Sequence, residues 1–315
     1  MIRRFLLYLS QAAWARSVTT RLAAARRVAR RFVAGETLDE ALEVTRKLNA
    51  KGLLVTLDYL GESVTSAEDA RGVMEAYRWI LERIASEKAQ ASVSLKLTHL
   101  GLDISEELCQ TNLRHILSIA KERSIGVTID MESTQYTDTT LRIYRTMRDE
   151  YGFDNVGTVI QAYLYRSEND MRDLAAEGAH IRLCKGAYLE PPTVAFPLKA
   201  DVDANYVKLT RQYLSAPPAG TSSLADERPY LCIATHDEKM IQAAENIIKE
   251  SKVSPARYEF QMLYGIRGAR QEELAKQHKM RVYVPFGTAW YPYFMRRLAE
   301  RPANLWFFAR SFFAR

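Results

Sequence analysis

The chain has 315 residues, 47% hydrophobic and 26% charged, a globular composition that can fill one barrel-sized domain or two smaller ones. Its net charge of +6 is modest, so we expect no nucleic-acid partner, and no apolar run approaches the roughly 20 residues that a membrane-spanning helix needs. The three cysteines, Cys109, Cys184 and Cys232, match no disulfide or metal-ligand spacing, which favours a reducing, cytoplasmic compartment and no metal site.

The first 45 residues are predicted to form a basic helical arm. Residues 1–35 contain eight arginines and no acidic residue, and apolar residues such as Leu22, Val28 and Phe32 lie among the arginines. Three interpretations stay open. The arm packs on the following domain, contacts a membrane surface, or is a mitochondrial transit peptide, for which an Arg-rich segment without acids is typical.

Residues 46–315 are predicted to form one (β/α)8 barrel, or TIM barrel, of the α/β class. Short apolar runs alternate with segments in which apolar residues recur every three or four positions, as Val73, Tyr77, Ile80 and Ile84 do. Such alternation is typical of a parallel sheet covered by helices, and eight strands favour closure into a barrel. The predicted strands are Leu53–Leu57, Ala91–Leu97, Gly126–Met131, Val156–Ala162, Ile181–Lys185, Tyr230–Thr235, Tyr258–Leu263 and Arg281–Val284.

Two segments stand outside this alternation. Ala216–Pro229 is rich in turn-forming residues and is predicted to be a surface loop before the sixth strand. After the eighth strand we expect a helix, and then the aromatic tail Leu305–Phe313, which is apolar enough to need a partner surface.

Polar residues stand at the ends of six predicted strands, where barrel enzymes place their sites. One such residue is as easily a buried structural group or a loop cap, but six together indicate a functional pocket. Several are basic, which suits an anionic ligand with a carboxylate or phosphate group. The residues are Lys96, Asp130, Gln161, Arg182, Lys185, Thr235, His236 and Tyr283.

In the last predicted helix Tyr293, Arg296 and Glu300 share one face, with Arg297 beside them. Spacing alone leaves two interpretations of the arginine pair open, a solvated face or a carboxylate clamp. The absence of a His-x-His pair, a Gly-x-Gly-x-x-Gly turn and a Gly-x-Ser-x-Gly elbow disfavours metal-dependent hydrolases, Rossmann dinucleotide binding and serine hydrolases. The residues thus indicate a barrel enzyme with a cationic mouth for an anionic cofactor or substrate.

Eight segments, in order from about residue 25 to the end, resemble the proline dehydrogenase family. The resemblance implies an FAD-dependent enzyme that oxidises L-proline to 1-pyrroline-5-carboxylate by hydride transfer, the first step of proline catabolism, and passes the electrons to a membrane quinone. The segments are Leu60–Ser63, Ser94–Asp103, Ile129–Glu132, Gln161–Arg166, Arg182–Pro191, Ala234–Asp237, Glu259–Gly265 and Tyr293–Arg301.

The same resemblance implies roles for single residues. Asp130 and Arg182 match catalytic positions, with Arg182 near the part of the flavin that accepts the hydride. Lys96, Arg296 and Arg297 resemble the residues that pair with the proline carboxylate, and Glu300 resembles the partner of one arginine. The wall around the pyrrolidine ring is matched by Tyr188, Leu263, Tyr283 and Tyr293. The positions that contact FAD are matched by Met131, Gln161, Arg182, Lys185, Gly186, Ala187, Thr235 and His236.

The resemblance also suggests partners and limits. Tyr283 crowds the far side of the ring and favours proline over its 4-hydroxylated analogue, whereas Phe286–Pro292 departs from the commoner family pattern. No second catalytic domain follows, so we expect a separate 1-pyrroline-5-carboxylate dehydrogenase, and peripheral contact with the inner face of the cell membrane. Two alternatives remain: a related barrel oxidoreductase with another cyclic amino acid or a deazaflavin carrier, and a non-enzymatic membrane-associated module.

Overall fold

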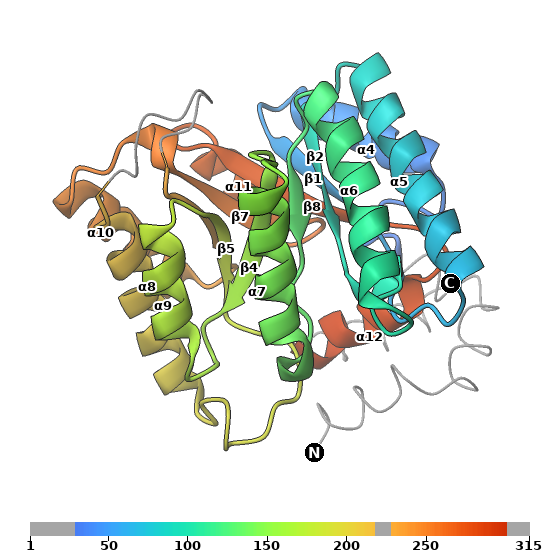
Figure 1. Cartoon of the computed structure of the whole chain (residues 1–315). Coiled ribbons are helices and arrows are strands. Elements are labelled where there is room, and N and C mark those ends of the chain that lie inside the picture. Colours follow the sequence, from blue (N-terminus) through green and yellow to red (C-terminus); the bar gives the residue numbers. More distant parts are fainter. Residues whose placement is uncertain (1–28, 218–227, 301–315) are drawn as a thin grey trace.

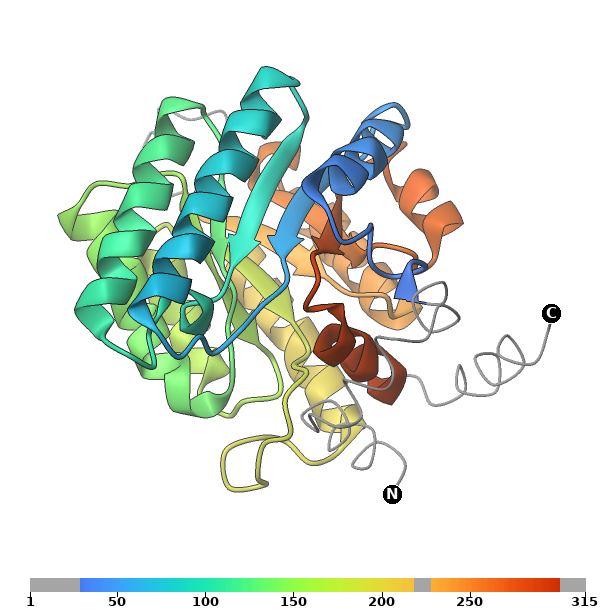
Figure 2. The ribbon, with the colours of Figure 1, turned by 90° about the vertical axis from the view of Figure 1, so that its right-hand side faces the viewer.

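Eight parallel strands close into a barrel, and helices cover its outside (Figures 1 and 2). The structure is a computed structural model that describes residues 29–217 and 228–300, with side chains described as far as Arg297. The strands pair in sequence order, and β8 returns to β1 with Leu54 opposite Arg281 and Tyr59 opposite Phe286. The predicted TIM-barrel fold is confirmed. The strands are β1 (Leu54–Tyr59), β2 (Ala91–Leu95), β3 (Val127–Ile129), β4 (Val156–Gln161), β5 (His180–Cys184), β6 (Tyr230–Ala234), β7 (Tyr258–Leu263) and β8 (Met280–Phe286).

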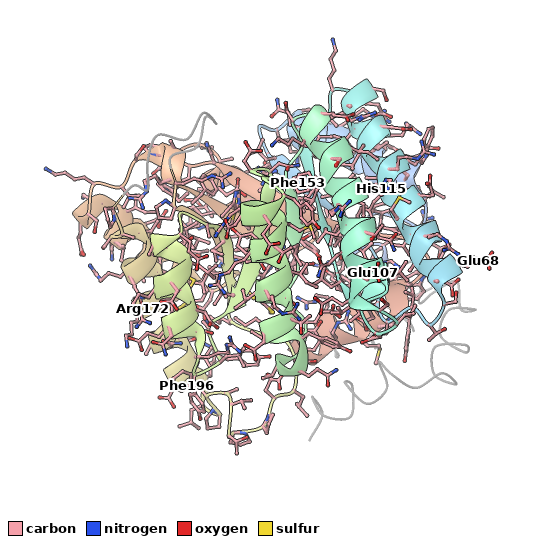
Figure 3. All side chains as sticks on the ribbon, viewed as in Figure 1. Glu68, Glu107, His115, Phe153, Arg172 and Phe196 are labelled. Carbon is pink, nitrogen blue, oxygen red and sulfur yellow. The ribbon has the colours of Figure 1, made fainter. Side chains whose placement is uncertain are left out.

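The outer helices are amphipathic, and several begin at a side-chain cap. Thr37 and Glu40 form a reciprocal capping box at the start of α4, and Ser66 and Ser105 cap α5 and α6. Polar residues such as Glu107 and Arg172 lie on the solvent side (Figure 3). The helices are α4 (Leu38–Asn49), α5 (Ala67–Ser86), α6 (Glu106–Glu122), α7 (Thr137–Arg145), α8 (Ser167–Ala176), α9 (Lys199–Leu214), α10 (Glu238–Glu250), α11 (Gly268–Leu274) and α12 (Trp290–Glu300).

The strand boundaries differ from the predicted ones at most ends, and the differences matter at the mouth of the barrel. β2 ends at Leu95 rather than Leu97, because the chain turns into a short 3-10 helix at Thr98–Leu100. β3 contains only three residues, although the backbone N–H of Asp130 still donates to the Leu95 carbonyl. Lys96 and Asp130 therefore stand just beyond their strands, at the carboxyl edge of the sheet.

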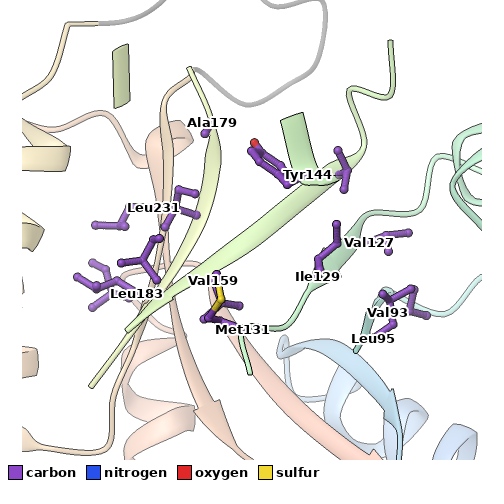
Figure 4. Close-up of a cluster of buried hydrophobic side chains, with 14 of the residues drawn as sticks. Val93, Leu95, Val127, Ile129, Met131, Tyr144, Val159, Ala179, Leu183 and Leu231 are labelled. Carbon is purple, nitrogen blue, oxygen red and sulfur yellow. The ribbon is translucent and has the colours of Figure 1, made fainter. Parts of the chain in front are cut away.

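Alternation along each strand separates an apolar outer layer from a polar interior. Val93, Leu95, Val127 and Ile129 belong to the large core between sheet and helices (Figure 4). The residues between them point into the barrel, because successive strand side chains face opposite sides of a sheet. On β5, for example, Ile181 and Leu183 lie in the outer core. Arg182 between them points inward and reaches across the barrel to Asp130, the residue just after β3. The barrel interior is thus available for charged and hydrogen-bonded groups.

The described end of the arm packs against α12. Ala29, Phe32 and Val33 form a separate apolar cluster with Trp290 and Phe294 of that helix. Backbone hydrogen bonds also join this segment to the end of β8, from Ala34 N to Pro285 O and from Gly287 N to Gly35 O. From Ala29 onward the arm therefore packs on the barrel, while the division at residues 45 and 46 stays a prediction. Residues 1–28, most of the Ala216–Pro229 loop and the tail Leu305–Phe313 lie outside the described residues.

Two further properties concern membranes and metals. None of the helices within 29–217 and 228–300 is long and apolar enough to cross a membrane. Across the same ranges no three His, Cys, Asp or Glu side chains are grouped so that they could hold a metal ion. Cys109, Cys184 and Cys232 take part in no disulfide within the described residues, and the first and last are buried.

Candidate active site

Buried charged side chains meet at the carboxyl ends of β1, β2 and β3. The Lys96 ammonium lies 3.5 Å from Asp58 Oδ1 and 3.6 Å from Asp130 Oδ2. Lys96 is 9% exposed and Asp58 is 1% exposed, so neither charge is solvated by bulk water. Because an unpaired buried charge is costly, the three groups stabilise one another. The lysine is held as a fixed cation at the mouth of the barrel.

Arg182 of β5 completes this cluster. Its Nη1 atom donates to Asp130 Oδ1 at 2.6 Å and to Ser94 Oγ at 3.0 Å, and its Nε atom donates to Gln261 Oε1 at 2.6 Å. The guanidinium also lies over the Tyr283 ring, 5.2 Å from its centroid. The remaining nitrogen, Nη2, is buried and has no hydrogen-bond partner within the described residues. A ligand atom at the mouth of the barrel could accept from it.

The ionisation of this cluster follows from burial and neighbouring charges. Burial raises the pKa of the Asp130 carboxyl, but the charges of Lys96 and Arg182 lower it by more than burial raises it. The pKa of Asp130 therefore lies below its ordinary value. Burial dominates at Asp58, whose pKa is raised although Lys96 opposes the shift. For Lys96 burial lowers the pKa, and Asp58 and Asp130 more than offset this, so the net shift is upward. Two cations, Lys96 and Arg182, therefore surround an ionised Asp130.

Tyr283 joins the cluster from β8. Its hydroxyl donates to Asp130 Oδ2 at 2.7 Å, which leaves both oxygens of that carboxylate occupied. Burial, followed by the Asp130 charge, raises the pKa of Tyr283 well above its ordinary value, so the hydroxyl keeps its proton. The prediction that Tyr283 stands at the mouth agrees with this position.

Helix α12 brings the predicted arginine pair over the same end of the barrel. Arg296 Nη1 donates to Glu62 Oε1 at 3.0 Å. Burial lowers the pKa of Arg296, but the charge of Glu62 opposes this effect, and the net shift of the pKa is upward. Arg297 lies over the Tyr293 ring, 5.1 Å from its centroid. The side chain of Glu300, predicted to hold one of these arginines, lies outside the described residues, so that pairing stays a prediction. The charge of Asp58 also contributes to the raised pKa of Arg296.

Tyr188 and Leu263 occupy loop and strand ends around the cluster. Burial raises the pKa of Tyr188, and its hydroxyl also responds to the charges of Glu132, Lys96 and Arg296. Leu263 ends β7, and its backbone N–H donates to His236 Nε2 at 3.1 Å. Both residues therefore stand at the same end of the barrel as the charged cluster.

The other predicted cofactor positions lie at or just beyond the carboxyl ends of β3, β4, β5 and β6. Lys185 is held between Asp203 and Asp237, with 2.7 Å to Asp237 Oδ2. Gln161 donates to the Glu132 carbonyl at 2.9 Å, and Thr235 accepts from the Asp237 backbone N–H at 3.1 Å. Met131 is buried just after β3, and Ala187 is partly buried in the loop after β5.

Gly186 in that loop is required for a steric reason. Its φ is +113°, and a Cβ atom there would lie 2.3 Å from Cδ1 of Tyr163. An L side chain is therefore excluded by both the backbone conformation and the neighbouring ring.

Sequence reasoning missed four residues of the cluster. Asp58 lies one position beyond the predicted end of the first strand, so a strand boundary one residue longer would have included it. Glu62, Ser94 and Gln261 lie inside the segments that resemble a known family, yet only their partners were given roles. For Asp58, Ser94 and Gln261 the available signal was polarity on the inward face of an otherwise apolar strand.

The sequence profile of one family, described as proline dehydrogenase, matches residues 41–310. Proline dehydrogenase 1 of Bacillus subtilis (strain 168) is 45% identical over 310 residues, which cover 96% of both chains. The chain belongs to the proline dehydrogenase family. Proline dehydrogenase 2 of the same strain is 43% identical over 97% of this chain and 96% of the relative. Proline dehydrogenase of Deinococcus radiodurans is 40% identical over 88% and 87%.

Solved structures of proline dehydrogenase relatives share the fold. Proline utilization A from Bdellovibrio bacteriovorus, inactivated by N-propargylglycine, superposes with a TM-score of 0.78 at 26% identity over 89% of this chain. The chain spans about a third, 33%, of the length of that structure. Family membership makes the activity that of a proline dehydrogenase, an oxidoreductase.

Proposed function

We propose that this proline dehydrogenase oxidises L-proline to 1-pyrroline-5-carboxylate, with FAD as its cofactor and a membrane quinone as the final electron acceptor. The observation that carries the proposal is the cluster of Lys96, Asp130, Arg182 and Tyr283 in a chain that matches proline dehydrogenases over nearly its whole length. Fixed cations and a tyrosine hydroxyl on one carboxylate form a preorganised polar site.

The residues present fit a flavin. The buried Nη2 of Arg182 offers a donor that the described residues leave unused, and a cation there favours the negative charge that reduction brings. Lys185, Thr235 and Gln161 add a cation, a hydroxyl and an amide, which suit a diphosphate and a polar ring system. When bound, FAD would supply the hydride acceptor. We assign its contacts to Met131, Gln161, Arg182, Lys185, Gly186, Ala187, Thr235 and His236.

The remaining assigned residues would bind and orient proline. Lys96, Arg296 and Arg297 would pair with its carboxylate, with Glu62 and Glu300 restraining the arginines. The ring wall consists of Tyr188, Leu263, Tyr283 and Tyr293.

Oxidation turns the ring C–N single bond into a double bond, as a hydride leaves the carbon and a proton leaves the nitrogen. Little acid–base machinery is needed once the amine is deprotonated, so holding the ring carbon in place can supply much of the rate. Asp130 and Arg182 are assigned to the catalytic centre, where Asp130 keeps the guanidinium and the Tyr283 hydroxyl in place.

The partners belong to the same proposal. The bifunctional protein PutA of Escherichia coli is 28% identical, and this chain covers 24% of it. We assign the next oxidation to a separate 1-pyrroline-5-carboxylate dehydrogenase, and the delivery of electrons to peripheral contact with the inner face of the cell membrane.

The decisive experiment is a visible spectrum of the purified chain. We expect flavin absorbance that L-proline bleaches without oxygen, and that a quinone then restores. A preparation that binds no flavin, or whose flavin keeps its colour with proline, would overturn the proposal. Bleaching by another cyclic amino acid but not by proline would change the substrate and keep the chemistry.

A further inference from the structure

A chain of buried polar groups runs through the barrel beneath the site. At the amino-terminal end of the strands Arg281 donates to Glu259, with Nε 2.7 Å from Oε1 and Nη2 3.1 Å from Oε2. The Gln261 side-chain amide nitrogen donates to Glu259 Oε1 at 2.5 Å, and Gln261 Oε1 accepts from Arg182 Nε at 2.6 Å. This series of hydrogen bonds thus joins the lower barrel to the Arg182 guanidinium at the mouth.

This series of hydrogen bonds is buried and is held at its lower end by Arg281. Glu259 is 2% exposed and Gln261 is 5% exposed, so water cannot replace their partners. Burial raises the pKa of Glu259, but Arg281 lowers it to about 2, and the group is anionic at neutral pH. Arg281 is itself held by the Val55 carbonyl at 3.0 Å and by Ser92 Oγ at 3.2 Å. An ionic anchor in the lower barrel therefore determines where the Gln261 amide points.

The amide determines in turn which nitrogen of Arg182 faces the ligand. A guanidinium has five N–H groups in a rigid plane, so fixing Nε and one Nη fixes the third nitrogen. Gln261 binds Nε, Asp130 and Ser94 bind Nη1, and only Nη2 is left without a hydrogen-bond partner among the described residues. By binding Nε, Gln261 opposes rotation of the guanidinium about its contact with Asp130.

We infer that Gln261 is a positioning residue, which, through the chain from Arg281 and Glu259, presents Nη2 of Arg182 to the flavin. The inference rests on the proposed flavin contact of Arg182. Gln261 itself touches neither substrate nor cofactor in this assignment. It is therefore expected to affect turnover more than proline binding, which is assigned to other residues.

The first test is Gln261→Met, which keeps the shape of the side chain and removes the acceptor. We expect kcat to fall about 10- to 100-fold, the range for one hydrogen bond to a charged group, with KM for proline changed less than threefold. The matched control is Asn155→Leu, which removes an amide bonded to the Leu117 and Ile125 carbonyls and should lower stability without changing kcat. An unchanged kcat in Gln261→Met would overturn the inference.

The second test breaks the link between Glu259 and Gln261 and keeps an acceptor for Arg182. Gln261→Glu places two carboxylates side by side, because Glu259 Oε1 already accepts from Arg281 Nε and from the Gln261 amide nitrogen. We expect the displaced side chain at position 261 to lower kcat, with KM for proline changed less than threefold. A kcat equal to that of the wild type would contradict a positioning chain anchored at Glu259.

Crystal structures of the wild type and Gln261→Met separate this inference from the proposed function. The guanidinium of Arg182 is expected to rotate in the variant, so that Nη2 leaves its wild-type direction. An unrotated guanidinium would overturn the inference even where proline bleaches the flavin. If proline fails to bleach the wild type, the proposed function fails, and the same structures still decide whether Gln261 fixes Arg182.

Discussion

The hydrogen bond from Tyr283 to Asp130 gives a prediction whose size follows from the structure. Tyr283→Phe removes a single hydroxyl that donates to a buried, ionised carboxylate at 2.7 Å, and leaves the ring beneath Arg182 in place. A hydrogen bond to a charged group contributes about 1.5–3 kcal/mol, so we expect the free energy of unfolding to fall by that amount. Equilibrium unfolding in urea measures it.

A matched control comes from Tyr77, which is fully buried and donates to the neutral Ser94 carbonyl at 2.8 Å. Tyr77→Phe should cost only about 0.5–1.5 kcal/mol, because the acceptor carries no charge. A double-mutant cycle of Tyr283→Phe with Asp130→Asn should give a coupling energy of about 1.5 kcal/mol. If Tyr283→Phe costs no more than Tyr77→Phe and the coupling is below about 0.5 kcal/mol, Asp130 is not the charged acceptor that we describe.

Three further predictions concern the arginines, pH and the arm. Arg296→Ala should raise KM for proline by at least about 30-fold, since losing a buried charge contact costs about 2–5 kcal/mol, whereas Arg172→Ala on the exposed face of α8 should leave KM unchanged. Burial raises the pKa of Glu132 from 4.5 to about 7, so the folded chain keeps a proton that the unfolded chain releases. The free energy of unfolding should therefore fall as pH rises from about 4.5 to 7, by about 3 kcal/mol in all, and Glu132→Gln should remove this slope in pH-dependent urea unfolding. Deleting residues 1–20 should weaken sedimentation with anionic vesicles while turnover with a soluble dye persists, and unchanged sedimentation would refute a membrane role.

The sequence was sufficient for the barrel because its strands are short, apolar and separated by amphipathic helices. β7 is observed over the predicted range, Tyr258–Leu263, since turn-forming residues bound it on both sides. β3 is much shorter than predicted, because residues such as Met131 are apolar for packing and not for strand pairing. Apolarity alone cannot separate these two causes.

The site was predictable only in part, for a related reason. Lys96, Asp130 and Arg182 were found because polar residues at strand ends contrast with apolar surroundings, and the structure brings them together. Their partners are spread over other strands, and pairing across a barrel depends on register and tilt. Nothing along the sequence indicates that Glu62 holds Arg296, 234 positions away.

The seam between Ala29–Gly35 and α12 has a mechanical consequence. The segment is joined to the barrel at Pro285 and Gly287, immediately before the helix that carries Arg296. Because Phe32 and Val33 also pack against Trp290 and Phe294, a displacement of this segment would move the helix that carries Arg296 together with it.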